Sequence, residues 1–297
     1  MKAPYSFRST ILSFAFFSIF TFQFLNVSSQ GTPGSVLFVH ADNQNSYGGF
    51  GNVWSDLSGN ANDGTISGAT YDATNKVFVF DGNDHVSFSS ALTAGDDTYT
   101  LEAYFKSTSS STQVVIEQNN SSLQFSRRAC ILLLSSGLGG FNGASNDRHD
   151  ITSYTTNSWE HWVLVCNVTA NNLKVFRNGS IAYDGTFANA GALNVGTGGV
   201  NIGKRVVSNG EYFVGEMKFA RIYDRVLTDS EALDNYTSRN NTVPVPDLAM
   251  LSDVTAECEV ASITAPTSTT PNPVTDLFIS EYSEGSSYNK YIEIFNG

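Results

Sequence analysis

Apolar and polar side chains alternate with a two-residue period in short segments between residues 36 and 239, the period typical of β-strands. The clearest example is residues 158–185, where the continuous apolar run 162–165 is followed by two alternating segments. The dipeptide Asn178-Gly179 separates those two segments. Both residues tolerate the positive φ of a type I′ turn, and Asn-Gly between alternating segments is a strong hairpin signal. This stretch therefore predicts three antiparallel strands in a row.

The same pattern continues along the chain and predicts roughly fourteen short strands, with turn residues about every ten positions. One helix is predicted after the last of these strands, because Thr228 and Glu231 have the spacing of a capping box. Many short strands and a single capped helix favour an all-β fold: a two-sheet antiparallel sandwich with one short C-terminal helix.

Three motifs agree in order with a known family. They are WSDLSGNANDG at residues 54–64, FDGNDHV at 80–86 and LKVFRNG at 173–179. Together they resemble the laminin G-like, concanavalin A-like jelly-roll domains of bacterial secreted proteins. The resemblance covers residues 36–239 and implies a jelly-roll domain over that range.

The first 29 residues have the composition of a signal peptide. Lys2 and Arg8 precede an apolar segment at residues 11–25, and small residues stand before a predicted cleavage after Ser29. A membrane anchor is the alternative, but the apolar run contains polar residues and is shorter than the roughly 20 residues of a spanning helix. We therefore expect a secreted, extracellular or cell-surface protein with no membrane span after processing.

The chain is acidic, with 16 Lys and Arg against 28 Asp and Glu and a formal net charge of −12. Such a surface repels the phosphate backbone, so no nucleic-acid partner is expected.

The composition changes after the predicted helix. Residues 240–275 contain five of the seven prolines and many Ser and Thr, which is typical of a linker. Residues 276–297 are apolar again and resemble the first strand pair of a bacterial lamin-tail domain, an Ig-like sandwich. Because two strands alone are not independently stable, we interpret 276–297 as the truncated start of that domain and the sequence as a fragment of a longer protein.

Three cysteines need an explanation in a secreted chain. Cys130 and Cys166 lie on predicted core strands, so they either form a disulfide or are buried as small hydrophobic residues. Cys258 would be the odd thiol, and no spacing predicts a zinc site.

Glycosidases of the laminarinase type share the implied fold and carry an E-x-D-x-x-E motif, which brings two carboxylates together on one strand face. No such motif occurs in this chain. Glu281 and Glu284 come nearest, and they lie in the appended segment without the middle Asp. The four histidines are scattered. We therefore predict that this region is not an enzyme.

The resemblance implies a carbohydrate-binding or adhesion module that recognises a glycan or a cell-surface ligand. Candidate ligand residues stand in or near Gly-rich loops; they are Tyr47, Phe50, Phe141, Asp147 and Tyr212. All three tryptophans are expected in the core. The alternative is an accessory module of a larger secreted hydrolase or nuclease whose catalytic domain lies beyond residue 297.

The segment 56–63 places side-chain oxygens at alternate positions, a pattern of hard ligands that suits Ca²⁺. The candidate ligands are Asp56, Ser58, Asn60, Asn62 and Asp63. The alternative is a loop of Asx-turns, in which Asp and Asn oxygens accept hydrogen bonds from nearby backbone amides and no ion is needed.

Overall fold

The computed structural model describes residues 31–93, 95, 98–119, 129–142, 148–187, 195–196, 198–206, 210–240, 277–284 and 290–296. The predicted signal peptide, nearly all of the predicted linker and Cys258 lie outside these residues. The strands and the helix belong to two compact units, and each is described by itself. Within the described residues, no helix is both long enough and apolar enough to cross a membrane.

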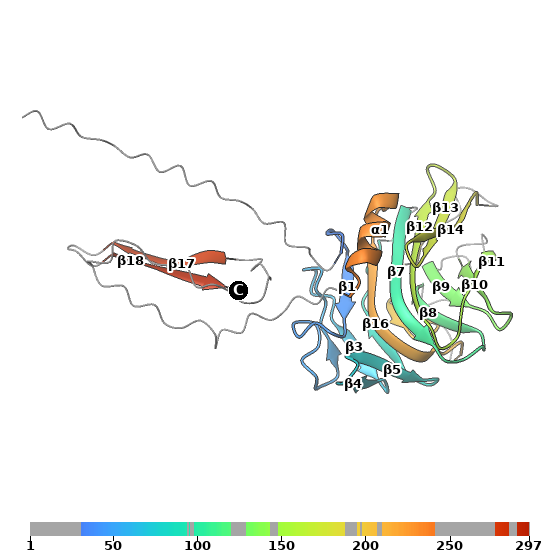
Figure 1. Cartoon of the computed structure of the whole chain (residues 1–297), viewed down its shortest axis with the longest axis horizontal. Coiled ribbons are helices and arrows are strands. Elements are labelled where there is room, and N and C mark those ends of the chain that lie inside the picture. Colours follow the sequence, from blue (N-terminus) through green and yellow to red (C-terminus); the bar gives the residue numbers. More distant parts are fainter. Residues whose placement is uncertain are drawn as a thin grey trace, which may run out of the picture. The chain divides into compact units, whose positions relative to one another are not determined.

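The larger unit contains two antiparallel sheets (Figure 1). Sheet A has the strand order β14 (Ser180–Gly185), β13 (Asn172–Arg177), β12 (Trp159–Asn167), β7 (Thr98–Ser107), β16 (Val214–Tyr223), β5 (Val77–Asp81) and β4 (Thr70–Asp72), and β1 (Leu37–His40) also pairs with β16. Sheet B has the order β11 (Arg148–Ser153), β10 (Leu138–Asn142), β9 (Ala129–Leu133), β8 (Gln113–Gln118), β15 (Val200–Ile202), β6 (His85–Phe88), β3 (Gly64–Ser67) and β2 (Val53–Trp54).

This architecture confirms the predicted all-β, two-sheet antiparallel sandwich with a jelly-roll-like arrangement. Strands also form in the Gly-rich segment after residue 135, where β10 pairs antiparallel with β11.

The core lies between the two sheets, and alternation along the strands decides which side chains enter it. On β12, Trp162 and Leu164 point into the core, whereas Val163 and Val165 point to the outer face of sheet A. These valines are nevertheless buried, because they pack in a second cluster with Ala232 of helix α1 (Asp229–Ser238). In Figure 1 the helix lies against β7 and β16, on the side away from β8 and β9. A strand buried on both faces is apolar at successive positions, which explains the run 162–165.

The two strongest local signals in the sequence are confirmed. Asn178 and Gly179 have φ values of 50° and 77°, and they connect β13 to β14 as a two-residue turn. Thr228 caps α1 with both bonds of the capping box: its hydroxyl accepts from the Glu231 amide, and the Glu231 carboxylate accepts from the Thr228 amide.

The predicted disulfide is not formed. Cys130 and Cys166 are both buried thiols. Cys166 points into the main core, whereas Cys130 packs with Val114 and Leu132 in a separate cluster. The side chains of Cys130 and its neighbour Ile131 belong to different clusters, as alternation along a strand requires, so Cys130 does not share the core with Cys166. The alternative interpretation as small hydrophobic residues describes this arrangement.

The smaller unit contains one hairpin among its described residues. Strands β17 (Leu277–Glu284) and β18 (Lys290–Asn296) pair antiparallel, with a register shift between Ile279 and Glu281. The predicted strand pair is thus present, and its assignment to a lamin-tail domain stays a prediction.

Candidate functional site

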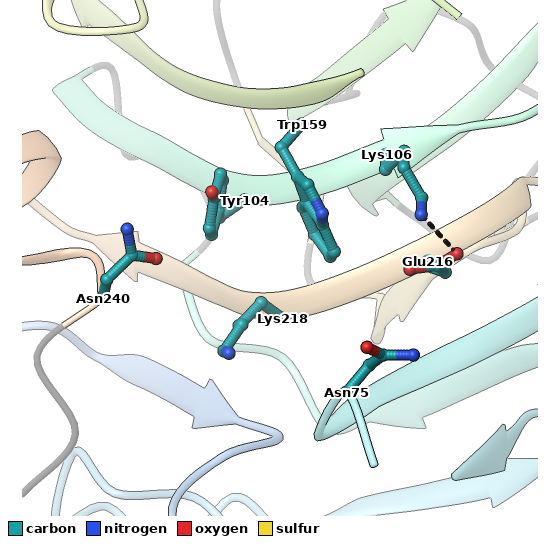
Figure 2. A pocket seen from close by; sticks show the side chains of 7 residues that line it. All are labelled: Asn75, Tyr104, Lys106, Trp159, Glu216, Lys218 and Asn240. Atoms are coloured by element: carbon teal, nitrogen blue, oxygen red, sulfur yellow. Dashed lines mark ion pairs between the residues drawn. The ribbon is translucent and has the colours of Figure 1, made fainter. Parts of the chain in front are cut away.

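The outer face of sheet A contains a pocket of about 190 Å³ beside helix α1. Seven residues line it, and we call it the Trp159 pocket (Figure 2): Asn75, Tyr104, Lys106, Trp159, Glu216, Lys218 and Asn240. Three neighbouring strands supply five of them: β7, β12 and β16. Asn75 belongs to the turn between β4 and β5, and Asn240 follows the helix.

Strand alternation explains why these side chains face outward. On β7, Ala103 and Phe105 enter the core, so Tyr104 between them and Lys106 after them point to the outer face. On β12, Trp162 enters the core, and Trp159 lies three positions earlier, which is the opposite face of a strand.

Two aromatic rings form the apolar part of the pocket. The ring centroids of Tyr104 and Trp159 lie 4.9 Å apart with a tilt of 42° between the planes. Tyr104 is 9% exposed, whereas Trp159 is only half-buried and presents its indole to the pocket. The Lys106 ammonium lies 5.5 Å from the Trp159 ring centroid, a cation–π distance that holds the indole in place.

Ion pairs surround the rings. Lys106 Nζ lies 2.6 Å from Glu216 Oε1, as the dashed line in Figure 2 marks. Lys218 Nζ lies 3.2 Å from Asp42 Oδ2, and Lys76 Nζ lies 2.8 Å from Asp42 Oδ1. One carboxylate is therefore shared between two ammonium groups.

Next to the pocket, helix α1 covers a buried polar cluster, which we call the Glu102 network: Glu102, His161, Arg221 and Asn235. Glu102 Oε1 lies 2.8 Å from both His161 Nε2 and Arg221 Nη1. The Asn235 amide nitrogen donates to Glu102 Oε2 at 2.7 Å, which ties the helix to the sheet. All four side chains are at most 2% exposed.

Burial by itself raises the pKa of Glu102, but the positive charge of Arg221 and the hydrogen bond from His161 outweigh it, so the pKa lies below its usual value. The carboxylate thus stays ionised inside the network.

The structure describes the side chains of three of the five ligand residues predicted from sequence, Tyr47, Phe50 and Tyr212, and none of these three lines the Trp159 pocket. Tyr47 is buried against Tyr71 and Phe78, and its hydroxyl donates to the Gly51 carbonyl, so its ring is part of the core. Phe50 is 83% exposed in a Gly-rich loop.

Tyr212 is half-buried, with the Lys204 ammonium 5.6 Å from its ring centroid. The backbone of Phe141 belongs to β10, whereas its side chain and the whole of Asp147 lie outside the described residues.

The tryptophans divide differently from the sequence prediction. Trp54 and Trp162 are fully buried as expected, but Trp159 lines the pocket. The odd spacing between Trp159 and Trp162 places them on opposite faces of β12, and this spacing was the signal in the sequence that could have found the site.

The predicted calcium loop uses its oxygens for its own hydrogen bonds. Asp56 Oδ1 accepts from the amides of Phe38 and Ser58, and Asp56 Oδ2 accepts from the Ser58 hydroxyl and the Asn62 amide. Asp63 Oδ1 accepts from the Asp56 amide. In the part of the chain that the structure describes, no group of three or more His, Cys, Asp or Glu could hold a metal ion. These contacts fit the Asx-turn alternative and leave few oxygen lone pairs for Ca²⁺.

The side chains of the two predicted asparagine ligands are bonded as well. Asn60 Nδ2 donates to the Val36 carbonyl and the Ser58 hydroxyl, and Asn62 Oδ1 accepts from the Ser89 amide. A second pocket of about 400 Å³ lies beside this loop. Small neutral residues and two asparagines line it, and none of its lining residues is aromatic. The Trp159 pocket is smaller but combines rings with charged groups, so it offers more specific contacts to a ligand.

Comparisons with known proteins agree with this fold. A family model described as the concanavalin A-like lectin/glucanases superfamily matches residues 80–232. That description covers both binding proteins and enzymes. No curated protein matches the chain.

Three solved structures represent the similar folds. Domain 4 of AbnA, an extracellular GH43 arabinanase from Geobacillus stearothermophilus solved with arabinotriose, has a TM-score of 0.53 at 18% identity, over 68% of this chain and 98% of the domain. A Trypanosoma rangeli sialidase with sialic acid has a TM-score of 0.52 at 15% identity, over 69% of this chain and 33% of the sialidase. The receptor-binding domain of a botulinum neurotoxin of the C/D mosaic serotype has a TM-score of 0.52 at 14% identity, over 69% of this chain and 51% of that chain. Structural similarity at identities this low shows a shared fold and nothing more.

Proposed function

The chain belongs to the concanavalin A-like lectin/glucanase superfamily, whose model matches just over half of it, and from this premise we propose that it is a non-catalytic carbohydrate-binding module whose ligand site is the Trp159 pocket. The observation that carries the proposal is the half-buried Trp159 indole at the centre of a ring of polar groups.

Sugars present apolar C–H faces and polar hydroxyl edges, so they are bound by an aromatic ring with hydrogen-bonding groups around it. Trp159 supplies the ring, and Tyr104 supports it from the side. Asn75 and Asn240 are exposed at the rim and offer both donors and acceptors, and Lys218 offers an ammonium donor. This combination of one apolar surface and a few converging polar groups is typical of a ligand pocket.

The similar folds support the same class of ligand. The arabinanase domain was solved with arabinotriose, and the chain described here covers nearly all of that domain's length. The sialidase match covers about one third of that enzyme, so this chain resembles the fold of one part of the sialidase and not the whole enzyme.

The charges in the pocket favour binding over catalysis. Glycosidases use two carboxyl groups that flank the scissile bond, separated by about 5–5.5 Å or 6.5–9.5 Å. Glu216 is the one carboxylate among the seven lining residues, and it is paired with Lys106. A turnover assay on a glycan panel tests this, and we expect no hydrolysis. Hydrolysis that disappears when one carboxylate is substituted would contradict this expectation.

We further propose that the module acts outside the cell, in adhesion to glycans or as an accessory module of a larger secreted enzyme, and that the β17–β18 hairpin begins a lamin-tail domain. The signal-peptide composition of residues 1–29 and the apolar strand pair support these proposals. Secretion of the chain fused to a reporter, lost when residues 1–29 are deleted, tests the first part.

A glycan array probed with three versions of the chain tests the site. Truncation of a tryptophan at the centre of a binding site costs about 2 kcal/mol or more, which exceeds a tenfold loss of affinity. We therefore expect Trp159→Ala to lower the array signals more than tenfold at a protein concentration below the wild-type Kd. Phe50→Ala is the matched control, because it removes a more exposed aromatic ring outside the pocket. Binding that survives Trp159→Ala, or that depends on Phe50 instead, would overturn the assignment.

A further inference from the structure

Charge distinguishes the Trp159 pocket from the rest of the molecule. The whole chain carries a formal charge of −12, yet two of the three charged side chains that line the pocket are lysines. Two more cations lie beside it: Lys76 contacts Asp42, and the Arg239 guanidinium lies 5.8 Å from the Tyr104 ring centroid.

The nearby carboxylates do not cancel these cations. Glu216 pairs with Lys106, and Asp42 is shared by Lys76 and Lys218. Asp72 does not line the pocket, but it accepts a hydrogen bond from the side chain of Asn75, which does. The group as a whole keeps an excess of positive charge on an otherwise acidic surface.

Lys218 is the cation best placed to contact a ligand. Its side chain is 18% exposed, and it shares its carboxylate with a second ammonium group, so its charge is only partly balanced. Figure 2 shows the Lys218 ammonium and the Lys106–Glu216 pair on different sides of the Trp159 indole. A sugar ring bound against Trp159 therefore has the Lys106–Glu216 pair on one side and the partly balanced Lys218 ammonium on the other.

The size of the pocket limits what enters it. Pockets for drug-sized ligands measure about 300–1,000 Å³, and this one measures about 190 Å³. It has room for roughly one sugar ring rather than for a length of polysaccharide chain.

We propose that the Trp159 pocket selects a single, negatively charged sugar ring, with the ring on Trp159 and its carboxylate or sulfate group at Lys218. This inference rests on the proposed function and specifies its ligand. Repulsion by the acidic surface elsewhere adds selectivity, because an anionic sugar is attracted at this position and disfavoured around it.

The test is calorimetric titration of the whole chain with matched monosaccharide pairs. Methyl glycosides of glucuronic and galacturonic acid and N-acetylneuraminic acid supply carboxylates, methyl glucoside and galactoside are the neutral counterparts, and glucose and galactose 6-sulfates supply the sulfate. We expect at least one anionic sugar to bind about tenfold or more tightly than its neutral counterpart. The carboxylate and sulfate arms show which anion is preferred. A preference that weakens with added salt supports the electrostatic cause.

Two variants locate the preference. Lys218→Met keeps most of the side-chain volume but removes the charge, so we expect the anionic and neutral sugars to bind within about twofold of one another. Lys174→Met is the matched control: Lys174 lies on β13 of the same sheet, pairs with Asp229 and lies outside the pocket, so the preference should persist.

The outcomes separate this inference from the proposed function. Neutral sugars that bind as tightly as every anionic partner, in a manner that Trp159→Ala abolishes, would overturn the inference and leave the module a lectin. Affinity that rises steadily with oligosaccharide length would overturn the single-ring part. The absence of any sugar binding that depends on Trp159 would overturn the proposed function itself.

Discussion

The outer face of sheet A has two halves that use the same strands in opposite ways. Strand β7 supplies Glu102 to one half and Lys106 to the other, and β12 supplies His161 and Trp159 in the same manner. Under helix α1, the polar side chains are at most 2% exposed and bond to one another. Beside the helix, the side chains that line the pocket are half-buried or exposed, except for that of Tyr104, which is buried.

The difference shows what a covering helix requires of a sheet. A charge removed from water is tolerated only when its partners are complete, so the Glu102 network is closed on itself. Where the helix ends, water can complete the same kinds of groups, and a ligand can replace that water. The network therefore stabilises the fold, and the pocket is available for binding.

The largest expected effect is the difference in the free energy of unfolding between two variants, each of which removes one charge from one half. Glu102→Gln leaves Arg221 buried without its carboxylate, which we expect to lower the free energy of unfolding by about 3–5 kcal/mol. Glu216→Gln breaks the Lys106 pair, whose side chains are 24% and 23% exposed, and should cost about 1 kcal/mol or less. Urea unfolding followed by tryptophan fluorescence measures both. Equal losses would contradict the comparison.

The Asp56 loop lies outside this face but resembles the Glu102 network, because the Asp56 carboxylate accepts four hydrogen bonds. Asp56→Ala removes the two oxygens that accept these four hydrogen bonds in a partly buried site, so we expect the free energy of unfolding to fall by about 2 kcal/mol. The melting temperature of the wild type should be the same with calcium and with a chelator. A melting temperature that rises with calcium, and no longer does so in Asp56→Ala, would support the calcium site instead.

Acid should reduce the stability that helix α1, which covers one of the two halves, contributes to the fold. Arg225 and the Thr228 amide bond to Glu231 and lower its pKa from 4.5 to about 2, although partial burial opposes the shift. Because the folded-state pKa is depressed, this contribution is complete above pH 4.5 and is lost as the pH falls toward 2. For a side chain that is 27% exposed, we expect about 1 kcal/mol after solvent screening.

Unfolding at a series of pH values, with Glu231→Gln for comparison, measures this contribution. The variant should be less stable than the wild type at pH 6 and nearly equal to it at pH 2. A constant difference across that range would show that the carboxylate charge is not responsible.

Local signals in the sequence predicted the elements around the site. The turn at Asn178-Gly179 and the cap at Thr228 depend on a few adjacent residues, so they were recognised correctly. The sheet order was not available from the sequence, because it depends on pairings such as β7 with β16, which lie more than a hundred residues apart.

The pocket was missed for the same reason. Whether an outward-facing tryptophan is buried depends on how far α1 extends over the sheet, and Trp159 lies beyond its cover. Asn75 and Asn240 reach the pocket from distant segments. Tyr47 shows the opposite error. Its Gly-rich surroundings suggested an exposed ring, but the ring is buried and packs on Phe78.

The most direct test of the central claim uses the indole signals of the ¹⁵N-labelled protein. The three tryptophans give three Nε1–H signals, assigned by single Trp→Phe variants, and Trp54 and Trp162 are internal controls because both are fully buried. On addition of the tightest-binding sugar from the titrations, we predict that the Trp159 signal shifts while the other two stay in place. A Trp159 signal that remains unchanged at saturating sugar would contradict the assignment of the pocket as the binding site.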